Sequence, residues 1–207
     1  MPTIDLAFDV VGESIPLDHG YALFSALCQV VPTLHGDKRI GVHPIRGRQT
    51  APGVLNVGEQ SRLRLRMPSE EVAMYLAVAG SRLELEGHRL RVGIPRVESL
   101  MPEANLGARL VIFRGLDEAE AFLGRVRHHL SALGINGEPV FVPSTRAGWA
   151  GQPMRRVIRI KEKRLIGYAL RVAGLTAEES ITLQEKGLGG RRRMGCGVFV
   201  PLRIQVR

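Results

Sequence analysis

The chain has 207 residues, of which 44% are hydrophobic and 24% are charged. This composition is typical of a globular protein and excludes a disordered or fibrous chain. No run of about 18 apolar residues predicts a membrane span, and residues 1–5 lack the basic and apolar segments of a secretory signal. We therefore expect a cytoplasmic protein without a membrane partner. Cys28 and Cys196 lie far apart and outside any C-x-x-C pair, which argues against a disulfide framework or a cysteine zinc site.

Hydrophobic periodicity predicts six strands and two helices in the first half of the chain. In residues 3–11 apolar side chains alternate with polar or small ones, as in a half-buried strand. A helix capped by Asp18 follows, with apolar residues at helical spacing up to Val31, and Pro32 ends it. Further strands are predicted at 39–45, 53–57, 62–67, 83–86 and 89–92, and a second helix at 69–78. Three arginines share one face of strand 62–67.

Residues 95–102 read as a linker, after which a similar order of elements returns. Strands are predicted at 108–113, 140–142, 156–160, 165–172 and 198–206, and helices at 117–133, capped by Asp117, and from Thr176 to Gly187. Thr176 and Glu179 have the spacing of a capping box. We therefore expect an α+β fold of two tandem ferredoxin-like (RRM-like) β-α-β-β-α-β domains, at 1–95 and 103–207. Sheets of this type commonly bind single-stranded RNA.

Positive charge is concentrated in the second half of the chain. The formal net charge is +9. Residues 1–103 carry 11 Lys and Arg against 12 Asp and Glu, a balance of −1, whereas residues 104–207 carry 18 against 8, a balance of +10. Clustered cations gain affinity for nucleic acids by releasing counterions from the phosphate backbone. We expect a nucleic acid to bind mainly through the second half.

A glycine-rich loop at residues 187–197 precedes the last predicted strand. Its glycines allow positive φ and close approach of backbone N–H groups to a ligand, and three arginines beside them add guanidinium groups suited to phosphates. The loop lacks the Gly-Lys-Ser/Thr ending of a P-loop and the G-x-G-x-x-G pattern of a dinucleotide site. The candidate anion-binding residues are Gly189, Gly190, Arg191, Arg192 and Arg193. An exposed turn with solvated charges is the alternative.

A second basic segment lies in the predicted strand pair of the second half. Its candidate RNA-binding residues are Arg155, Arg156, Arg159, Lys161 and Lys163. Arg159, Lys161 and Lys163 alternate, so we expect them to share one face. The alternative is a solvated sheet edge, since Lys and Arg also protect edges from pairing. Trp149, in a polar loop, is a candidate for stacking on a base.

Several segments resemble one known family. They are Asp18-His19-Gly20-Tyr21 through Ser25-Ala26-Leu27, then Leu34-His35-Gly36-Asp37-Lys38-Arg39, and Ile166-Gly167-Tyr168 through Gly174-Leu175 into the glycine-rich loop. With tandem domains and a C-terminal glycine-rich loop, the chain resembles the CRISPR-associated repeat-RNA endoribonucleases of the "Cas-six" type in the RAMP superfamily, as a short type I variant. The resemblance implies binding of CRISPR repeat RNA and cleavage of the precursor crRNA without metal or cofactor. It also implies retention of the product in an effector complex with other CRISPR subunits, by a monomer or weak dimer.

Such cleavage uses the ribose 2′-hydroxyl as nucleophile and leaves 2′,3′-cyclic phosphate and 5′-hydroxyl ends. Histidine suits the proton transfers because its pKa lies near neutral pH. His35 follows the first predicted helix in a polar loop and matches the family's catalytic histidine, so it is the first candidate for general base or acid. Lys38 or Arg39 is a candidate for stabilising the pentacoordinate phosphate, and Arg39 also for binding RNA.

The remaining candidates are secondary. His43, His19 and Tyr21 are further catalytic candidates, although His19 can instead cap the helix, while His88, His128 and His129 suit solvated structural roles. Relatives place a tyrosine or histidine where this chain has Cys28, and a thiol is a poor acid toward an alkoxide, so no catalytic role is carried over to it. The alternative functions are a non-catalytic RNA-binding subunit of a CRISPR ribonucleoprotein, and a ferredoxin-like RNA-binding or translation-associated protein unrelated to CRISPR.

Overall fold

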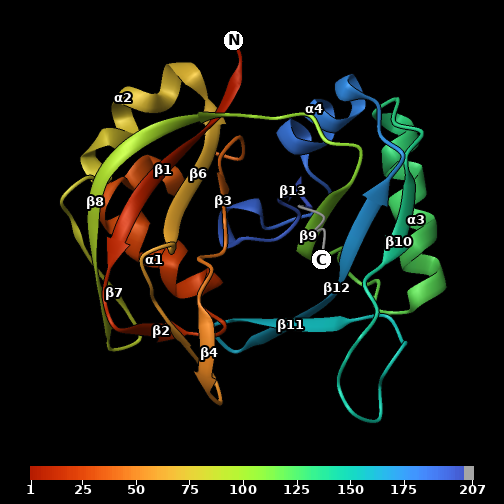
Figure 1. Cartoon of the computed structure of the whole chain (residues 1–207), viewed down its shortest axis with the longest axis horizontal. Coiled ribbons are helices and arrows are strands. Elements are labelled where there is room, and N and C mark those ends of the chain that lie inside the picture. Colours follow the sequence, from red (N-terminus) through yellow and green to blue (C-terminus); the bar gives the residue numbers. More distant parts are fainter. Residues whose placement is uncertain (203–207) are drawn as a thin grey trace. The chain divides into compact units, whose positions relative to one another are not determined.

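The computed structural model describes residues 1–202 and divides the chain into two compact units. The first unit comprises residues 1–99 together with residues 193–195. The second comprises residues 100–192 and, within the described part of the chain, residues 196–202. Antiparallel sheets and helices make up both units, as expected for a mixed α/β protein (Figure 1).

The main sheet of the first unit contains five strands. In sheet order they are β3 (Gly41–Val42), β6 (Arg62–Pro68), β1 (Thr3–Val11), β8 (His88–Ser99) and β7 (Arg82–Leu85), and all neighbours are antiparallel. The predictions for β1, β6, β7 and β8 are confirmed, but only two residues of the predicted strand 39–45 are in β3. The linker predicted at 95–102 is wrong in its first half, since β8 continues through Pro95 to Ser99, paired with β1.

Alternation along β1 and β6 gives this sheet two chemically different faces. On one face Leu6 lies opposite Leu65 and Phe8 opposite Leu63, and all four side chains are buried. The arginines of β6 share the other face, as predicted, opposite acidic or small residues of β1, with Asp5 facing Arg66. One face of the β1–β6 pair therefore belongs to the apolar core, and the other face carries charged side chains.

The helical segments of the first unit are short. They are α1 (Gly20–Val30), η1 (Pro32–His35), η2 (Ser69–Glu71), α2 (Val72–Tyr75) and η3 (Leu76–Val78). The predicted cap at Asp18 is wrong, because the N-cap residue of α1 is His19 and makes no side-chain capping bond. The predicted helix 69–78 divides into one α-helical turn between two 3₁₀ turns, a common form for short helical ends.

A small three-stranded sheet of the first unit was largely missed. It orders β2 (Ser14–Pro16), β5 (Val54–Asn56) and β4 (Arg48–Ala51), and only β5 is predicted. Every residue of β4 is exposed, so this strand has no apolar alternation from which it could be recognised.

The second unit has a sheet of β10 (Glu138–Phe141), β12 (Lys163–Ala173), β9 (Leu106–Val111) and β13 (Val200–Pro201) in that order, with β11 (Arg155–Ile160) also paired to β12. Helices α3 (Ala119–Ala132) and α4 (Ala177–Lys186) complete it. Phe122, Val126 and Leu130 of α3 recur at helical spacing and join Leu170 of β12 in the core. Of the predicted strand 198–206, residues 203–206 lie outside the described residues.

The two helices of the second unit begin with side-chain caps. The cap predicted at Asp117 is wrong by one residue, because the Glu118 carboxylate accepts from the N–H groups of Glu120 and Ala121. The capping box of α4 is confirmed: the Thr176 hydroxyl accepts from the Glu179 N–H, and the Glu179 carboxylate accepts from the Thr176 N–H.

The two units repeat one strand order. Taken as strand, helix, two strands, helix and strand, the principal elements are β1, α1, β3, β6, α2 and β8 in the first unit and β9, α3, β10, β12, α4 and β13 in the second. In both, the strands lie in the order second, third, first, fourth. None of the helices formed by residues 1–202 is long and apolar enough to cross a lipid bilayer.

Candidate functional site

His35 is the last residue of η1, and its side chain is exposed. Pro32 begins this 3₁₀ turn, and Leu34, which is fully buried, anchors it. The imidazole lies beside the Phe24 ring of α1, with 6.0 Å between ring centroids and an interplanar angle of 33°. The first unit therefore presents an accessible imidazole on a short, anchored turn.

The cations that follow His35 differ in their surroundings. Arg39 donates to both carboxylate oxygens of Asp37, at 3.1 and 2.8 Å, and to Glu71 at 2.5 Å. The side-chain bond from Arg39 to Asp37 lowers the pKa of the Asp37 carboxyl. Lys38 is exposed. Because Arg39 is already neutralised by two carboxylates, Lys38 is the better placed of the two to meet a phosphate.

His19 is buried, and protein groups engage both of its ring nitrogens. Nε2 accepts from the Ile45 N–H at 3.0 Å, and Nδ1 lies 2.9 Å from the carbonyl oxygen of Pro16. A carbonyl only accepts, so Nδ1 carries the proton and the ring is neutral. This bonding favours a structural role that ties the start of α1 to neighbouring loops.

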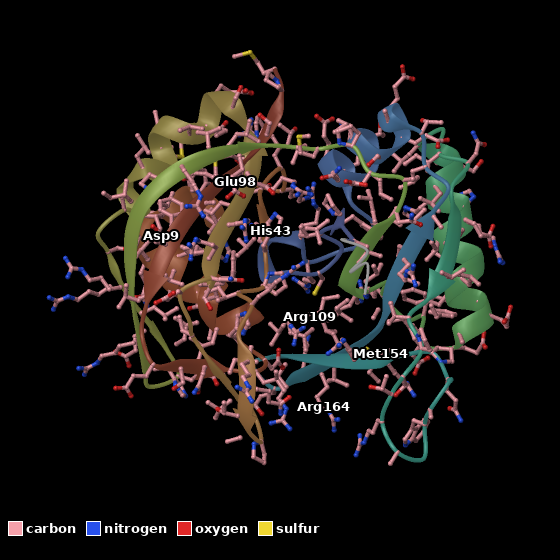
Figure 2. All side chains as sticks on the ribbon, viewed as in Figure 1. Asp9, His43, Glu98, Arg109, Met154 and Arg164 are labelled. Carbon is pink, nitrogen blue, oxygen red and sulfur yellow. The ribbon has the colours of Figure 1, made fainter. Side chains whose placement is uncertain are left out.

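His43 belongs to a buried charged cluster with Asp5 and Arg66 (His43 is labelled in Figure 2). Arg66 donates from Nε and Nη2 to the two oxygens of Asp5, both at 2.8 Å, and His43 Nε2 lies 3.3 Å from Asp5 Oδ1. Burial alone would raise the pKa of the Asp5 carboxyl, but the bonds from Arg66 and His43 hold this pKa well below its usual range. Burial lowers the pKa of His43, partly offset by Asp5. This bonding favours a structural role for His43 as well.

The free energy of unfolding is expected to fall as the pH is lowered from about 7 to about 5, by up to about 1.4 kcal/mol per pH unit for each proton involved. The unfolded chain binds a proton at His43 near pH 6.5, whereas the folded state resists it because the folded pKa is lower. Asp5 acts separately, below about pH 4, where its unfolded carboxyl takes up a proton. Urea titrations at several pH values measure this slope.

The matched variant is His43→Gln. This variant should show a smaller slope of unfolding free energy against pH between pH 5 and pH 7. The contribution of His129 to that slope should remain, since burial lowers the pKa of His129 as well. An unchanged slope in His43→Gln would show that the buried imidazole does not resist protonation.

Tyr21 and Cys28 are both half-buried residues of α1. Cys28 follows Phe24 by four residues and so lies on the same face of the helix. Burial raises the pKa of the Cys28 thiol, so the thiol is protonated at neutral pH and is a weak candidate for catalysis.

The glycine-rich loop connects α4 to β13 and includes η4 (Arg192–Met194). The Gly190 N–H donates to the Ile112 carbonyl at 3.0 Å, and the Gly197 N–H to the Leu110 carbonyl at 2.7 Å. The expectation of uncovered amides is therefore wrong for Gly190, whose N–H is bonded within the protein. Gly189 has φ of 73° and packs so closely against Ile112 that a side chain there would strike its carbonyl. These glycines serve close packing of the loop.

The three arginines of the loop are in different environments. Arg191 is exposed and has φ of 67°, whereas Arg192 is half-buried beside Gly187. Arg193 belongs to the first unit and donates from Nη1 to the carbonyl oxygens of Leu34, at 2.9 Å, and of His35. Its guanidinium carbon lies 5.4 Å from the centroid of the Phe24 ring. Arg193 was predicted to bind phosphate, but its side chain contacts the turn that carries His35 and the Phe24 ring.

Strands β11 and β12 form a hairpin. The prediction that Arg159, Lys161 and Lys163 share one face is wrong. β11 ends at Ile160, and Lys161, with φ of 53°, lies in the turn before β12. Lys161 and Lys163 therefore do not continue the face of Arg159, which lies opposite Arg164 (labelled in Figure 2). Four cations nonetheless surround the exposed tip: Arg159, Lys161, Lys163 and Arg164.

The base of the hairpin holds the other two predicted cations. Arg155 pairs with Asp117 at 3.4 Å on the surface. Arg156 is half-buried and donates from Nη2 to the Met154 sulfur at 3.1 Å, and its pKa is lowered by burial and by nearby Arg109 (Met154 and Arg109 are labelled in Figure 2). Trp149 is 57% exposed in the loop between β10 and β11. Sequence reasoning missed Arg109 and Arg164. Arg164 directly follows Lys163 and could have been included, whereas Arg109 lies on β9, far along the chain from Arg156, and only the fold brings the two charges near each other.

The chain is similar to known proteins of one family. A model of the Cas6 family, described as Cas6 Crispr, matches residues 4–204. The chain is 40% identical over 201 residues to the CRISPR-associated endonuclease Cas6 of Myxococcus xanthus (strain DK1622), covering 97% of this chain and 82% of that protein.

Two solved structures share the fold at low sequence identity. The product of a Cas6-related gene from Pyrococcus furiosus aligns with a TM-score of 0.71 at 13% identity, covering 98% of this chain and all of that one. A RAMP protein described as binding different RNA substrates aligns with a TM-score of 0.70, also at 13% identity, with the same coverage. These two similarities concern the fold. The family model and the relative from M. xanthus show that the chain belongs to the Cas6 family.

Proposed function

We propose that this chain is a metal-independent endoribonuclease that binds CRISPR repeat RNA and cuts precursor crRNA. The observation that carries the proposal is the exposed imidazole of His35 on its anchored turn, in a chain of the Cas6 family. The relative from M. xanthus is named an endonuclease, which supports the same activity here. In the proposed architecture, each repeat of the strand order second, third, first, fourth is a ferredoxin-like domain, within 1–95 and 103–207.

The proposed reaction uses groups of the protein, the RNA and solvent water. Neutral His35 removes the proton of the ribose 2′-hydroxyl, and the 2′-oxygen forms a bond to the adjacent phosphorus. The bond from phosphorus to the 5′-oxygen breaks, that oxygen takes up a proton from water, and His35 releases its proton to the solvent. The products are a 2′,3′-cyclic phosphate and a 5′-hydroxyl. Exposed Lys38 stabilises the charge on the pentacoordinate phosphate.

RNA binding is assigned to the cations of the second unit and to groups near His35. The support is the balance of +10 in residues 104–207, from 18 Lys and Arg against 8 Asp and Glu, and the exposed tip of the β11–β12 hairpin. The proposed residues are Arg39, Arg155, Arg156, Arg159, Lys161, Lys163, Arg191 and Arg192, with Trp149 stacking on a base. Gly189 and Gly190 are left out because they pack against Ile112. The proposed assembly is a cytoplasmic monomer or weak dimer that keeps the mature crRNA and joins other CRISPR effector subunits.

Incubating the protein with 5′-labelled repeat RNA in excess EDTA tests this function. We expect one cut per repeat and a 5′ product that ends in a 2′,3′-cyclic phosphate, because 2′-oxygen attack requires no metal. Tight binding without a cut would instead identify a non-catalytic RNA-binding subunit. A cut that stops in EDTA and resumes with added Mg²⁺ would contradict the mechanism.

A further inference from the structure

The Arg193 side chain contacts groups around His35. Nη1 donates to the carbonyl oxygens of Leu34 and His35, and the guanidinium carbon lies 5.4 Å from the Phe24 centroid. The His35 ring packs on that same Phe24 ring, at 6.0 Å between centroids. One cation therefore touches the backbone on both sides of His35 and the aromatic ring that supports its imidazole.

The two carbonyls that Arg193 binds have a particular relation to the imidazole. The Leu34 carbonyl belongs to the peptide plane that precedes the His35 Cα, and the His35 carbonyl belongs to the plane that follows it. Fixing both planes restricts φ and ψ of His35, and these angles set the direction of its Cα–Cβ bond. The last carbonyls of a helical turn also have no partners within the turn, so a cation there is favourable.

The backbone next to Arg193 packs closely against the first unit, which places the Arg193 side chain beside the His35 turn. Met194 is buried, and Gly195 has φ of 82°. A Cβ at Gly195 would lie 2.9 Å from Pro44 Cγ and 3.5 Å from the Val42 carbonyl oxygen. Residues 193–195 therefore pack as part of the first unit, and a glycine at 195 permits the close approach.

We propose that Arg193 is a positioning residue: by holding the peptide planes on both sides of His35, it makes residues 193–195, the part of the glycine-rich loop within the first unit, a support for the catalytic imidazole. This role rests on the proposed endoribonuclease function. It predicts that Arg193 acts on the rate of the cut, whereas exposed Arg191, two residues earlier in the loop, acts on RNA binding.

Single-turnover cleavage and RNA binding of Arg193→Ala, Arg193→Lys and the matched control Arg191→Ala separate these roles. Arg193→Ala should lower the rate constant at saturating protein by about 10- to 100-fold, the scale expected for a misplaced catalytic group. Its dissociation constant and the salt dependence of binding should remain those of the unmodified protein. Arg191→Ala should reduce the salt slope by about one unit. Arg89→Ala, at an exposed arginine of β8 that has no proposed role in binding or catalysis, should cut at the native rate.

Two rescue measurements exclude a general folding defect. Arg193→Lys should recover part of the rate, because a single nitrogen, Nη1, makes both carbonyl bonds in the native protein. Guanidinium ion at sub-denaturing concentration should raise the rate of Arg193→Ala and leave His35→Ala unchanged. An Arg193→Ala protein that cuts at the native rate, or that neither lysine nor guanidinium restores, would overturn the proposal.

A readout without cleavage keeps this inference separate from the proposed function. In the free protein, NMR resonances of the His35 amide and ring should shift and broaden in Arg193→Ala and remain native in Arg191→Ala. Native His35 resonances in Arg193→Ala would overturn the positioning role, even if the protein cuts RNA. Shifted resonances in a protein that does not cut would support the contact and reject only the endoribonuclease function.

Discussion

Replacing His35 by Ala is expected to lower the single-turnover rate constant for repeat-RNA cleavage by about 10²- to 10⁴-fold, the contribution of a positioned general acid or base. The side chain is exposed at the end of η1 and packs against the Phe24 ring. Its removal should therefore leave the fold and the dissociation constant of the RNA almost unchanged. Rapid-quench cleavage at saturating protein and filter binding measure the two quantities.

The chain offers matched controls for this substitution. His128 is an exposed histidine on α3 of the second unit, and His128→Ala should cut at the native rate. His19→Ala should lower the free energy of unfolding, because the Ile45 N–H and the Pro16 carbonyl lose their partners. Native cleavage by His35→Ala would show that another group accepts the proton.

Replacing Arg66 by Ala is expected to lower the free energy of unfolding by about 3–5 kcal/mol, the typical loss when one partner of a buried ion pair is removed. Arg66 is 2% exposed and Asp5 is 8% exposed. Without the two bonds from Arg66, the Asp5 carboxylate would remain buried with His43 as its nearby partner. Urea unfolding monitored by circular dichroism measures the change.

Arg64→Ala is the matched control on the same strand and face. Arg64 pairs with Glu98 at 2.9 Å, but each side chain is about one third exposed, at 32% and 33% (Glu98 is labelled in Figure 2). Surface pairs contribute about 0–1 kcal/mol, so its loss should be small. The double variant Asp5→Asn, Arg66→Met should lose less than the sum of its single substitutions, because it leaves no unpaired charge. If Arg64→Ala and Arg66→Ala lowered the free energy of unfolding equally, burial would not determine how much each ion pair contributes to stability.

The predictions of secondary structure were correct where burial of one face gives the sequence a regular hydrophobic pattern. Alternation along residues 3–11 predicted β1, and the Thr176 capping box predicted the start of α4, because both signals are local. The exposed strand β4 and the short β3 lack such a period, and pairing with distant strands determines them. The alternating acids of β1 and arginines of β6 are the signal from which the Asp5–Arg66 pair could have been found.

The candidate site follows the same division. An accessible His35 could be predicted because Pro32 ends the helix and a polar segment follows. The contact with Arg193 spans 158 residues of sequence, and no local pattern distinguishes Arg193 from Arg191 or Arg192. Long-range packing thus changed the interpretation of the glycine-rich loop from bare amides around a phosphate to a closely packed support.

Adding imidazole to His35→Gly during cleavage of repeat RNA tests the proposed chemistry most directly. If the missing imidazole is the proton acceptor, the rate should rise with the concentration of neutral imidazole, and the product should again end in a 2′,3′-cyclic phosphate. A His35→Gly protein whose cleavage does not respond to imidazole, while the unmodified protein cuts the same RNA, would contradict the assignment of His35 as the catalytic base.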